Sequence, residues 1–426
     1  YQVICGDMPC ANPITMFQGR LFAGECRPGG RLMELDQHGG AHRILLDDVP
    51  MPNAMEVGPD GLLYFPVMGV NEIWRVSPEG GVPEVVARDL GVPDAVKFDA
   101  EGFIVSTQVA SGQVLRIDPQ TGDKTILATI APGLDNLSFV DGRLFVSSIS
   151  GQINEIDSHG EVRSLIHDGL QWPMGLAVAD DNSLFIADGG YTYTLQPSGK
   201  PQLAGMLFSP GFPGFTRGVT STGSGEWLVT TANGDVARFW PAEQRSEVLA
   251  SGFDQLMGVV MNDNSAVICA EYGAGRVLGI ESGNVTELAT GLDKPMGVAI
   301  DADGTCYVAE SGAGRVIKLS DKQADTFVDG LQEPQGLAIH DGKLLIIDVG
   351  GKELIELELV GNGRRIIASN LPVGAPPGIT AKPLGAVGNL SGPMTSFCGL
   401  AVGGDGTVYV TADAQGCVLA VSSESI

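Results

Sequence analysis

Residues 295–316 read PMGVAIDADGTCYVAESGAGRV, and residues 256–277 read LMGVVMNDNSAVICAEYGAGRV. In the same register, the two stretches share a Met-Gly pair, an apolar run, an Ala-Glu pair and a closing Gly-Ala-Gly-Arg-Val. Turns rich in Gly, Asp and Asn separate the short apolar runs, which is typical of β-strands joined by hairpins. The pattern lacks a sustained helical period, so the repeated unit is predicted to be all-β.

Related units occur along the whole chain. The residue just before each predicted first strand is Asn12, Asn53, Asp94, Asp135, Met174, Arg217, Met257, Met296, Gln335 and Cys398. These positions lie 39 to 43 residues apart, apart from a last step of 63 residues. In the second repeat the four strands are expected at 54–57, 62–66, 72–76 and 84–87. A period near 40 with four short strands per unit predicts a β-propeller.

The favoured arrangement is one domain, 1–426, in which about ten repeats close into a single ring. The last repeat offers three strands, ending near 419–423, and a spare strand at 2–5 could pair with it and remove two open edges. Cys5 and Cys417 would then be close, either as two thiols or as a disulfide. The alternative is two smaller propellers in tandem, divided near 209–216. The long insertion at 371–397 is either a lid over a site or a surface loop.

Composition narrows the function. The formal charge of −26 and the pI of about 4.4 make nucleic acid an unfavourable partner. No apolar run is long enough to span a membrane, and no signal peptide is visible, so we expect a soluble, cytoplasmic protein that acts on a small molecule. No glycine-rich phosphate loop predicts a nucleotide cofactor. No histidine falls at the start of a first strand, which disfavours a Ser-His-Asp triad.

The first strands of a propeller line its axis, so the residues before them should meet. One arc of the expected ring is rich in oxygen ligands, and the other is rich in thioethers. We interpret Asn53, Asp94 and Asn136 as ligands of a hard divalent cation, most simply Ca²⁺. The predicted substrate wall consists of Met174, Met257, Met296 and Gln335. Alternatively, Asn and Asp cap turns here and Met fills the axis.

Acidic residues recur at the ends of the predicted second strands. They are Glu25, Asp188, Glu271, Glu310, Asp348 and Asp413. The candidate catalytic residues are Glu25, Asp135, Arg217, Glu271 and Glu310. An acid among these is a candidate general base or extra ligand, while Arg217 could bind a carboxylate or an oxyanion. The structural alternatives are a hydrogen bond to the neighbouring glycine-rich turn for the acids, and charge balance for Arg217.

Two segments resemble known families. Residues 52–65, PNAMEVGPDGLLYF, resemble the senescence marker protein, gluconolactonase and luciferin-regenerating enzyme superfamily, and residues 295–316 are similar to NHL-type and strictosidine-synthase-like repeats. The first resemblance implies one axial divalent cation held by Glu, Asn and Asp, and lactone hydrolysis. Asn53 matches the family's Pro-Asn-Asp segment, but Ala54 replaces its Asp, and Met174-Gly175 stands where the family has Ser-Asn-Gly. That family has six blades, whereas ten repeats are counted here.

Three functions remain open. The first is a lactonase-like hydrolase with a central cation, acting on a moderately apolar lactone or related carbonyl compound. The second is a metal-independent lyase or synthase that uses a base such as Glu271 or Glu310. The third is a non-catalytic propeller that binds a ligand or a protein.

Overall fold

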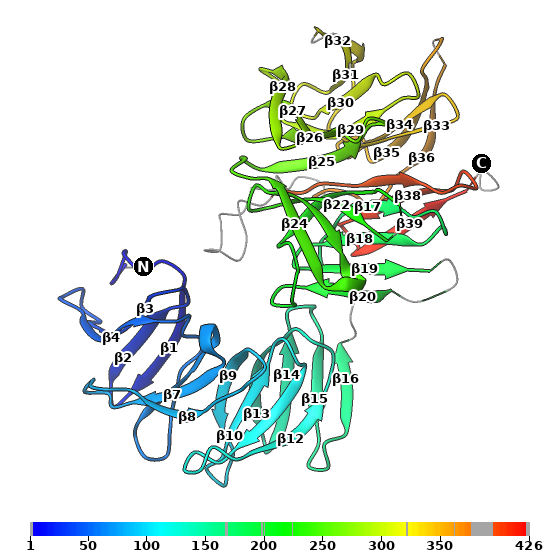
Figure 1. Ribbon diagram of the computed structural model, residues 1–426. Coiled ribbons are helices and arrows are strands. Elements are labelled where there is room, and N and C mark those ends of the chain that lie inside the picture. Colours follow the sequence, from blue (N-terminus) through cyan, green and yellow to red (C-terminus); the bar gives the residue numbers. More distant parts are fainter. Residues whose placement is uncertain are drawn as a thin grey trace. The chain divides into compact units, whose positions relative to one another are not determined.

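A computed structural model describes residues 3–166, 169–196, 199, 201–223, 225–320, 323–361, 363–375 and 395–422. Its strands form ten antiparallel sheets, nine with four strands and one with three (Figure 1). The helical elements of these residues are two single 3-10 turns, η1 (Met68–Val70) and η2 (Pro241–Glu243). The predicted all-β repeat fold is therefore confirmed. In the described residues, no helix has the length and apolar character needed to cross a membrane.

The chain divides into two compact units, Tyr1–Gly169 and Leu170–Ile426. The first contains four sheets, each with its strands in chain order. They are β1 (Ala11–Phe17), β2 (Arg20–Glu25), β3 (Gly30–Leu35) and β4 (Arg43–Val49); β5 (Glu56–Val57), β6 (Leu63–Val67), β7 (Glu72–Val76) and β8 (Glu84–Ala87); β9 (Pro93–Phe98), β10 (Ile104–Gln108), β11 (Gln113–Ile117) and β12 (Lys124–Thr129); and β13 (Leu134–Val140), β14 (Arg143–Ser148), β15 (Ile153–Ile156) and β16 (Val162–Ile166).

The second unit contains the other six sheets. They are β17 (Pro173–Val178), β18 (Leu184–Asp188), β19 (Tyr191–Leu195) and β20 (Gln202–Met206); β21 (Thr216–Ser221), β22 (Trp227–Thr231), β23 (Val236–Trp240) and β24 (Arg245–Ala250); β25 (Leu256–Met261), β26 (Val267–Glu271), β27 (Arg276–Glu281) and β28 (Asn284–Thr290); β29 (Pro295–Ile300), β30 (Cys306–Glu310), β31 (Arg315–Ser320) and β32 (Gln323–Val328); β33 (Pro334–His340), β34 (Lys343–Asp348), β35 (Glu353–Glu358) and β36 (Arg364–Ser369); and β37 (Leu400–Val402), β38 (Val408–Ala412) and β39 (Cys417–Val421).

The six first strands of the second unit form a closed ring. Each is followed around the ring by the first strand of the next sheet, and β37 lies beside β17. The approach is so close that a Cβ on Gly297 would lie 2.2 Å from the carbonyl oxygen of Gln335 in the next sheet. At the other five ring glycines an added Cβ would also lie too close to a backbone carbonyl oxygen of the next sheet. The glycine and the residue that provides this oxygen are Gly175 and Arg217, Gly218 and Met257, Gly258 and Met296, Gly336 and Cys398, and Gly399 and Met174. Glycine is therefore required by backbone proximity at this position.

This closure does not confirm the single ring of ten repeats. The last sheet packs beside β17, at the start of the second unit, and in the described residues it has three strands. The described part of 2–5 does not supply a fourth strand, since Cys5 packs against Ala23, Met33 and Leu35 of the first sheet. Cys417 belongs to the apolar cluster of the last two sheets, and both thiols are free. The division at 169/170 also differs from the alternative boundary near 209–216.

Burial explains the apolar inner strands of the sheet β29–β32. In the sheet of β29–β32, the first two strands are almost wholly buried, whereas β32 is mostly exposed. The inner strands are covered on both faces by neighbouring sheets, so they read as continuous apolar runs rather than as an alternating pattern. The hairpin after β29 is closed by Asp301, whose carboxylate accepts the amide hydrogens of Asp303 at 3.0 Å and Thr305 at 2.8 Å. Some of the acidic residues of the chain therefore stabilise hairpin turns.

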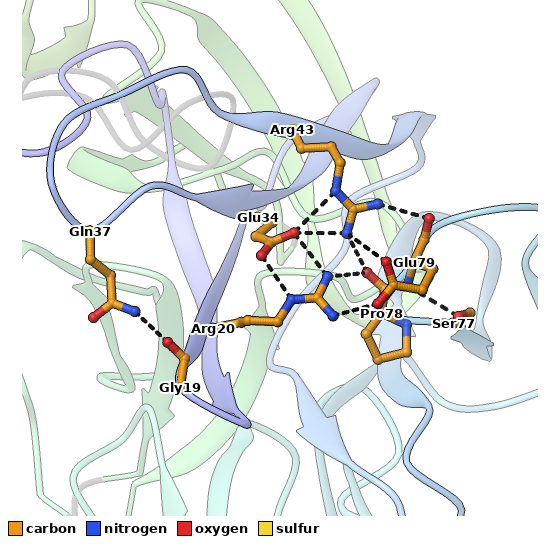
Figure 2. A network of polar contacts seen from close by, with 8 residues as sticks. All are labelled: Gly19, Arg20, Glu34, Gln37, Arg43, Ser77, Pro78 and Glu79. Carbon is orange, nitrogen blue, oxygen red and sulfur yellow. Dashed lines mark hydrogen bonds and ion pairs between the residues drawn. The ribbon is translucent and has the colours of Figure 1, made fainter.

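Polar contacts also join neighbouring sheets at their outer strands. Figure 2 shows Glu34 of β3 between Arg20 and Arg43, which donate hydrogen bonds to it at 2.8 and 2.7 Å. Both guanidinium groups also reach the hairpin after β7, where they bond the carbonyl oxygen of Pro78 at 3.0 and 2.6 Å. This network connects the first two sheets of the first unit.

Candidate functional site

Four polar side chains meet where the first strands of the first unit begin. Asn12 donates a hydrogen bond to the side-chain oxygen of Asn53, whose amide nitrogen in turn donates to Asp94. The carboxyl group of Asp94 is also hydrogen-bonded to that of Asp135. We call Asn12, Asn53, Asp94 and Asp135 the polar arc. Residues about 40 positions apart thus become neighbours, as the propeller geometry predicts.

The polar arc contains a buried carboxyl pair. Asp94 is 6% exposed and Asn53 is 7% exposed, whereas Asp135 is half-buried and Asn12 is exposed. Burial raises the pKa of Asp94 well above its ordinary value, and the hydrogen bond and negative charge of Asp135 raise it further. Two like charges side by side in a buried site are unfavourable, so these surroundings favour the protonated form of Asp94 when no cation is bound.

The neighbouring thiol of Cys26 is not prepared for nucleophilic chemistry. Burial raises its pKa to about 11, although a hydrogen bond with Asn12 partly opposes the shift. A thiol reacts as its thiolate, which is scarce at neutral pH with such a pKa.

The structure changes the membership of the predicted oxygen site. Asn136 is exposed, and its backbone pairs with the Ser147 hydroxyl, at 3.2 Å through the amide and 3.3 Å through the carbonyl. Asp135, one position earlier, provides the side chain in the arc. The repeat spacing places Asn12 at the position equivalent to Asn53, although the predicted ligand set does not include it. Its position before the first strand was the signal that could have identified it.

Glu25 is buried and paired with two arginines, which gives it a structural role. Its side chain is 0% exposed and accepts hydrogen bonds from the guanidinium groups of Arg27, at 2.8 Å, and Arg31. Burial alone would raise the pKa of Glu25, but the bonds from Arg31 and Arg27 outweigh it and hold the pKa below its usual value. A carboxylate with two cationic partners is a weak proton acceptor, which argues against its predicted role as a base.

The acids of the second unit anchor the loops that precede their own sheets. Glu310 accepts the amide hydrogen of Asp293 at 2.8 Å and pairs with Arg315 at 2.6 Å. Glu271 makes the equivalent contacts, accepting the Asp254 amide at 2.7 Å and pairing with Arg276. The shorter acids make backbone contacts: Asp188 with Gln171 and Trp172, Asp348 with Gln332 and Glu333, and Asp413 with Gly374. These contacts favour the structural interpretation of the repeated acids.

The predicted substrate wall lies in the second unit, whereas the polar arc lies in the first. Met174, Met257 and Met296 are at most 2% exposed and share one apolar cluster with Phe397, although their sheets are not all consecutive. Gln335, 0% exposed, accepts the Cys398 amide hydrogen at 2.7 Å. These side chains therefore fill the start of the six-sheet ring.

Arg217 belongs to the same ring of the second unit. Its side chain is 0% exposed, and its guanidinium lies 4.0 Å from the Met257 sulfur. Burial lowers the pKa of Arg217 to about 10, and the negative charge of Asp254 partly opposes this. A contact with an external substrate is not supported by such burial.

A cavity of about 590 Å³ follows the axis of the second unit. It begins at the six ring glycines and continues along the first strands to their ends, and Phe397 also lines it. A second cavity of about 680 Å³ lies between the sheets of β17–β20 and β21–β24, and Asp180, Ser221 and Gly223 line both. Residues 376–394 of the predicted lid lie outside the described residues.

Comparison with known proteins adds no family. No protein-family model and no curated protein matches the chain. Among solved structures, the chain is similar to a nidogen/laminin complex (16% identity, TM-score 0.41, covering 51% of this chain and 89% of that one). It is also similar to a glucose dehydrogenase from Thermus thermophilus (17%, 0.40, 57% and 91%) and to virginiamycin B lyase from Staphylococcus aureus (14%, 0.24, 69% and 90%). Similarity at this level carries no argument about activity.

Proposed function

We propose that the first unit is a hydrolase that opens a lactone or a related carbonyl compound at the polar arc. The proposal depends on one observation: the polar arc brings the carboxyl groups of Asp94 and Asp135 together, and burial of Asp94 raises its pKa well above the ordinary value and so favours its protonated form. Such a pair contains both an acid and a base at the same pH, which is what hydrolysis requires.

Each carboxyl has a role that follows from its surroundings. Asp135 is half-buried, so as the carboxylate it can accept a proton from a water molecule that attacks the carbonyl carbon. Asp94 retains its proton and can donate it to the departing ring oxygen. After this step the proton is on Asp135, and transfer across their hydrogen bond restores the starting state. The amide of Asn53 donates a hydrogen bond to Asp94, and Asn12 in turn holds Asn53.

The donor set also suits a hard divalent cation. Two amide and two carboxyl side chains provide the oxygen ligands that Ca²⁺ prefers, with Asp135 in the position predicted for Asn136. The residues that would hold it are Asn12, Asn53, Asp94 and Asp135. When bound, a cation would polarise the carbonyl as a Lewis acid and displace the shared proton, so the cation and the protonated Asp94 are alternative sources of acid catalysis at this site.

The experiment is proton release from a panel of γ- and δ-lactones, followed in a pH-stat. Asp94→Asn and Asp135→Asn should each lower kcat by roughly 100-fold or more, the usual contribution of general acid–base catalysis. Asp141→Asn is the matched control, because this exposed turn residue follows the same strand as Asp135. Full activity in both variants would refute the polar arc as the site.

The cation is tested separately by measuring the metal content of the purified protein. Asn53→Ala and Asp94→Ala should lose bound Ca²⁺, and chelation should lower the Tm of the wild type by mass action. Unchanged metal content in both variants would place any cation elsewhere. The metal-independent lyase has less support, since Glu271 and Glu310 are each committed to a backbone amide and an arginine.

A further inference from the structure

The walls of the axial cavity of the second unit are polar because backbone groups of the first strands line it. Each first strand is the edge strand of its sheet, so the six strands turn their outer backbone edges toward the axis. A strand edge presents both N–H and C=O groups, and such groups require hydrogen-bond partners when they are enclosed. A ligand that follows the axis would therefore both donate and accept hydrogen bonds along its length.

The cavity has a blocked end and a mouth. At the blocked end, ring residues such as Met257 and Gln335 are 0% exposed and immediately precede the lining glycines. From those glycines the lining continues for about four residues of strand, roughly 13 Å at the usual rise. At the mouth, Ser221 joins the axial cavity to the second cavity. These limits favour a narrow, linear ligand.

Charge restricts the ligand further. Among the described residues that line the axial cavity, Asp180 carries the only charge, and no lysine, arginine or histidine is present. Thr220, Ser221 and Thr222 also line the cavity. The chain as a whole carries a formal charge of −26. Both the local and the overall charge disfavour an anion and favour a neutral or positively charged compound.

We propose that the axial cavity of the second unit binds a linear polyhydroxyl compound, uncharged or carrying an amine, with its head group beside Asp180. This site is separate from the polar arc, and it does not depend on hydrolysis there.

Three probes with the same six-carbon body test this inference: glucamine, sorbitol and gluconate. Titration calorimetry should give binding in the order glucamine, sorbitol, gluconate, with glucamine up to about fivefold tighter than sorbitol, as one exposed ion pair allows. Ser221→Trp should weaken glucamine and sorbitol at least tenfold by obstructing the mouth. Any binding of these probes at the polar arc is the same in the wild type and in the cavity variants, so it cancels when their affinities are compared.

Asp180→Asn should abolish the preference for glucamine over sorbitol while leaving sorbitol binding unchanged. Asp303→Asn is its matched control, because Asp303 is exposed in the corresponding hairpin of another sheet and lines neither cavity. Thermal melting shows whether each variant is folded. Absence of binding by glucamine and sorbitol, equal binding of gluconate and glucamine, or unchanged affinity in a folded Ser221→Trp protein would each overturn the proposal.

Discussion

The hydroxyl group of Thr411 donates a 2.8 Å hydrogen bond to the backbone carbonyl of Met174, a residue 237 positions earlier in the chain. The same hydroxyl accepts the amide hydrogen of Gly399 at 2.7 Å, and Gly399 also donates to the Met174 carbonyl at 3.1 Å. Thr230 makes the equivalent contacts with Gly218 and Met257. One threonine therefore links the first strand of its own sheet to that of the next, and at Thr411 this link closes the ring.

Replacement of Thr411 by valine should destabilise the second unit. Valine keeps the shape but removes the hydroxyl, so buried backbone groups of Met174 and Gly399 lose a partner, at about 1–3 kcal/mol. Urea unfolding should show the loss. Thr290→Val, at an exposed position of β28, is the control and should change stability little. Equal stability of the two variants would mean that this bond does not matter for closure.

Addition of one methyl group at a ring glycine should also be costly. In Gly297→Ala the new Cβ would lie 2.2 Å from the Gln335 carbonyl oxygen, so the neighbouring backbone must shift. We expect a loss of about 1–3 kcal/mol, as for other overpacked interiors, seen as a lower Tm. Gly404→Ala should be tolerated, because its nearest atom lies at an ordinary 3.4 Å. A wild-type Tm for Gly297→Ala would contradict the close approach of the strands.

Asp94→Asn should alter how stability depends on pH. The pKa of Asp94 is raised in the folded protein, so the folded state binds more protons than the unfolded state once the pH exceeds the ordinary aspartate value. Stability from this group is therefore present at low pH and decreases as the pH rises through the raised pKa. In the presence of a chelator, Asp94→Asn should flatten this decrease above the ordinary aspartate pKa, measured by urea unfolding over a series of pH values. A parallel curve for wild type and variant would argue against the shared proton.

Glu34 should have the opposite dependence. Hydrogen bonds from Arg20 and then Arg43 lower its pKa to about 2, so its contribution is present above pH 4.5 and is lost as the pH falls toward 2. Glu34→Gln should destabilise the first unit by about 1.5–3 kcal/mol at neutral pH, the range for hydrogen bonds to charged groups. Its effect should disappear on acidification. Glu101→Gln, at a side chain that is 76% exposed, should have little effect at either pH.

The sequence by itself determined the repeat, its period and the strands. The strands of the second repeat are predicted at 54–57, 62–66, 72–76 and 84–87, and the structure has β5–β8 at 56–57, 63–67, 72–76 and 84–87. Such features depend on local turn chemistry and on apolar runs, which are written in consecutive residues. The meeting of Asn53, Asp94 and Asp135 also followed, because repeats of equal length place equivalent residues side by side.

Only the tertiary structure decided where the ring closes and which side chains form the arc. A closing contact joins residues such as Met174 and Thr411 that no local pattern relates, so repeat counting could not separate one ring of ten from a six-sheet ring. A sequence signal for the division does exist: glycine follows the ring residue in each of the six later repeats, whereas Pro13, Ala54, Ala95 and Asn136 follow it in the first four. These glycines are needed because neighbouring first strands lie too close together to leave room for a methyl group. The sequence alone does not give this distance, because the distance between segments far apart in the chain is set only when the chain folds.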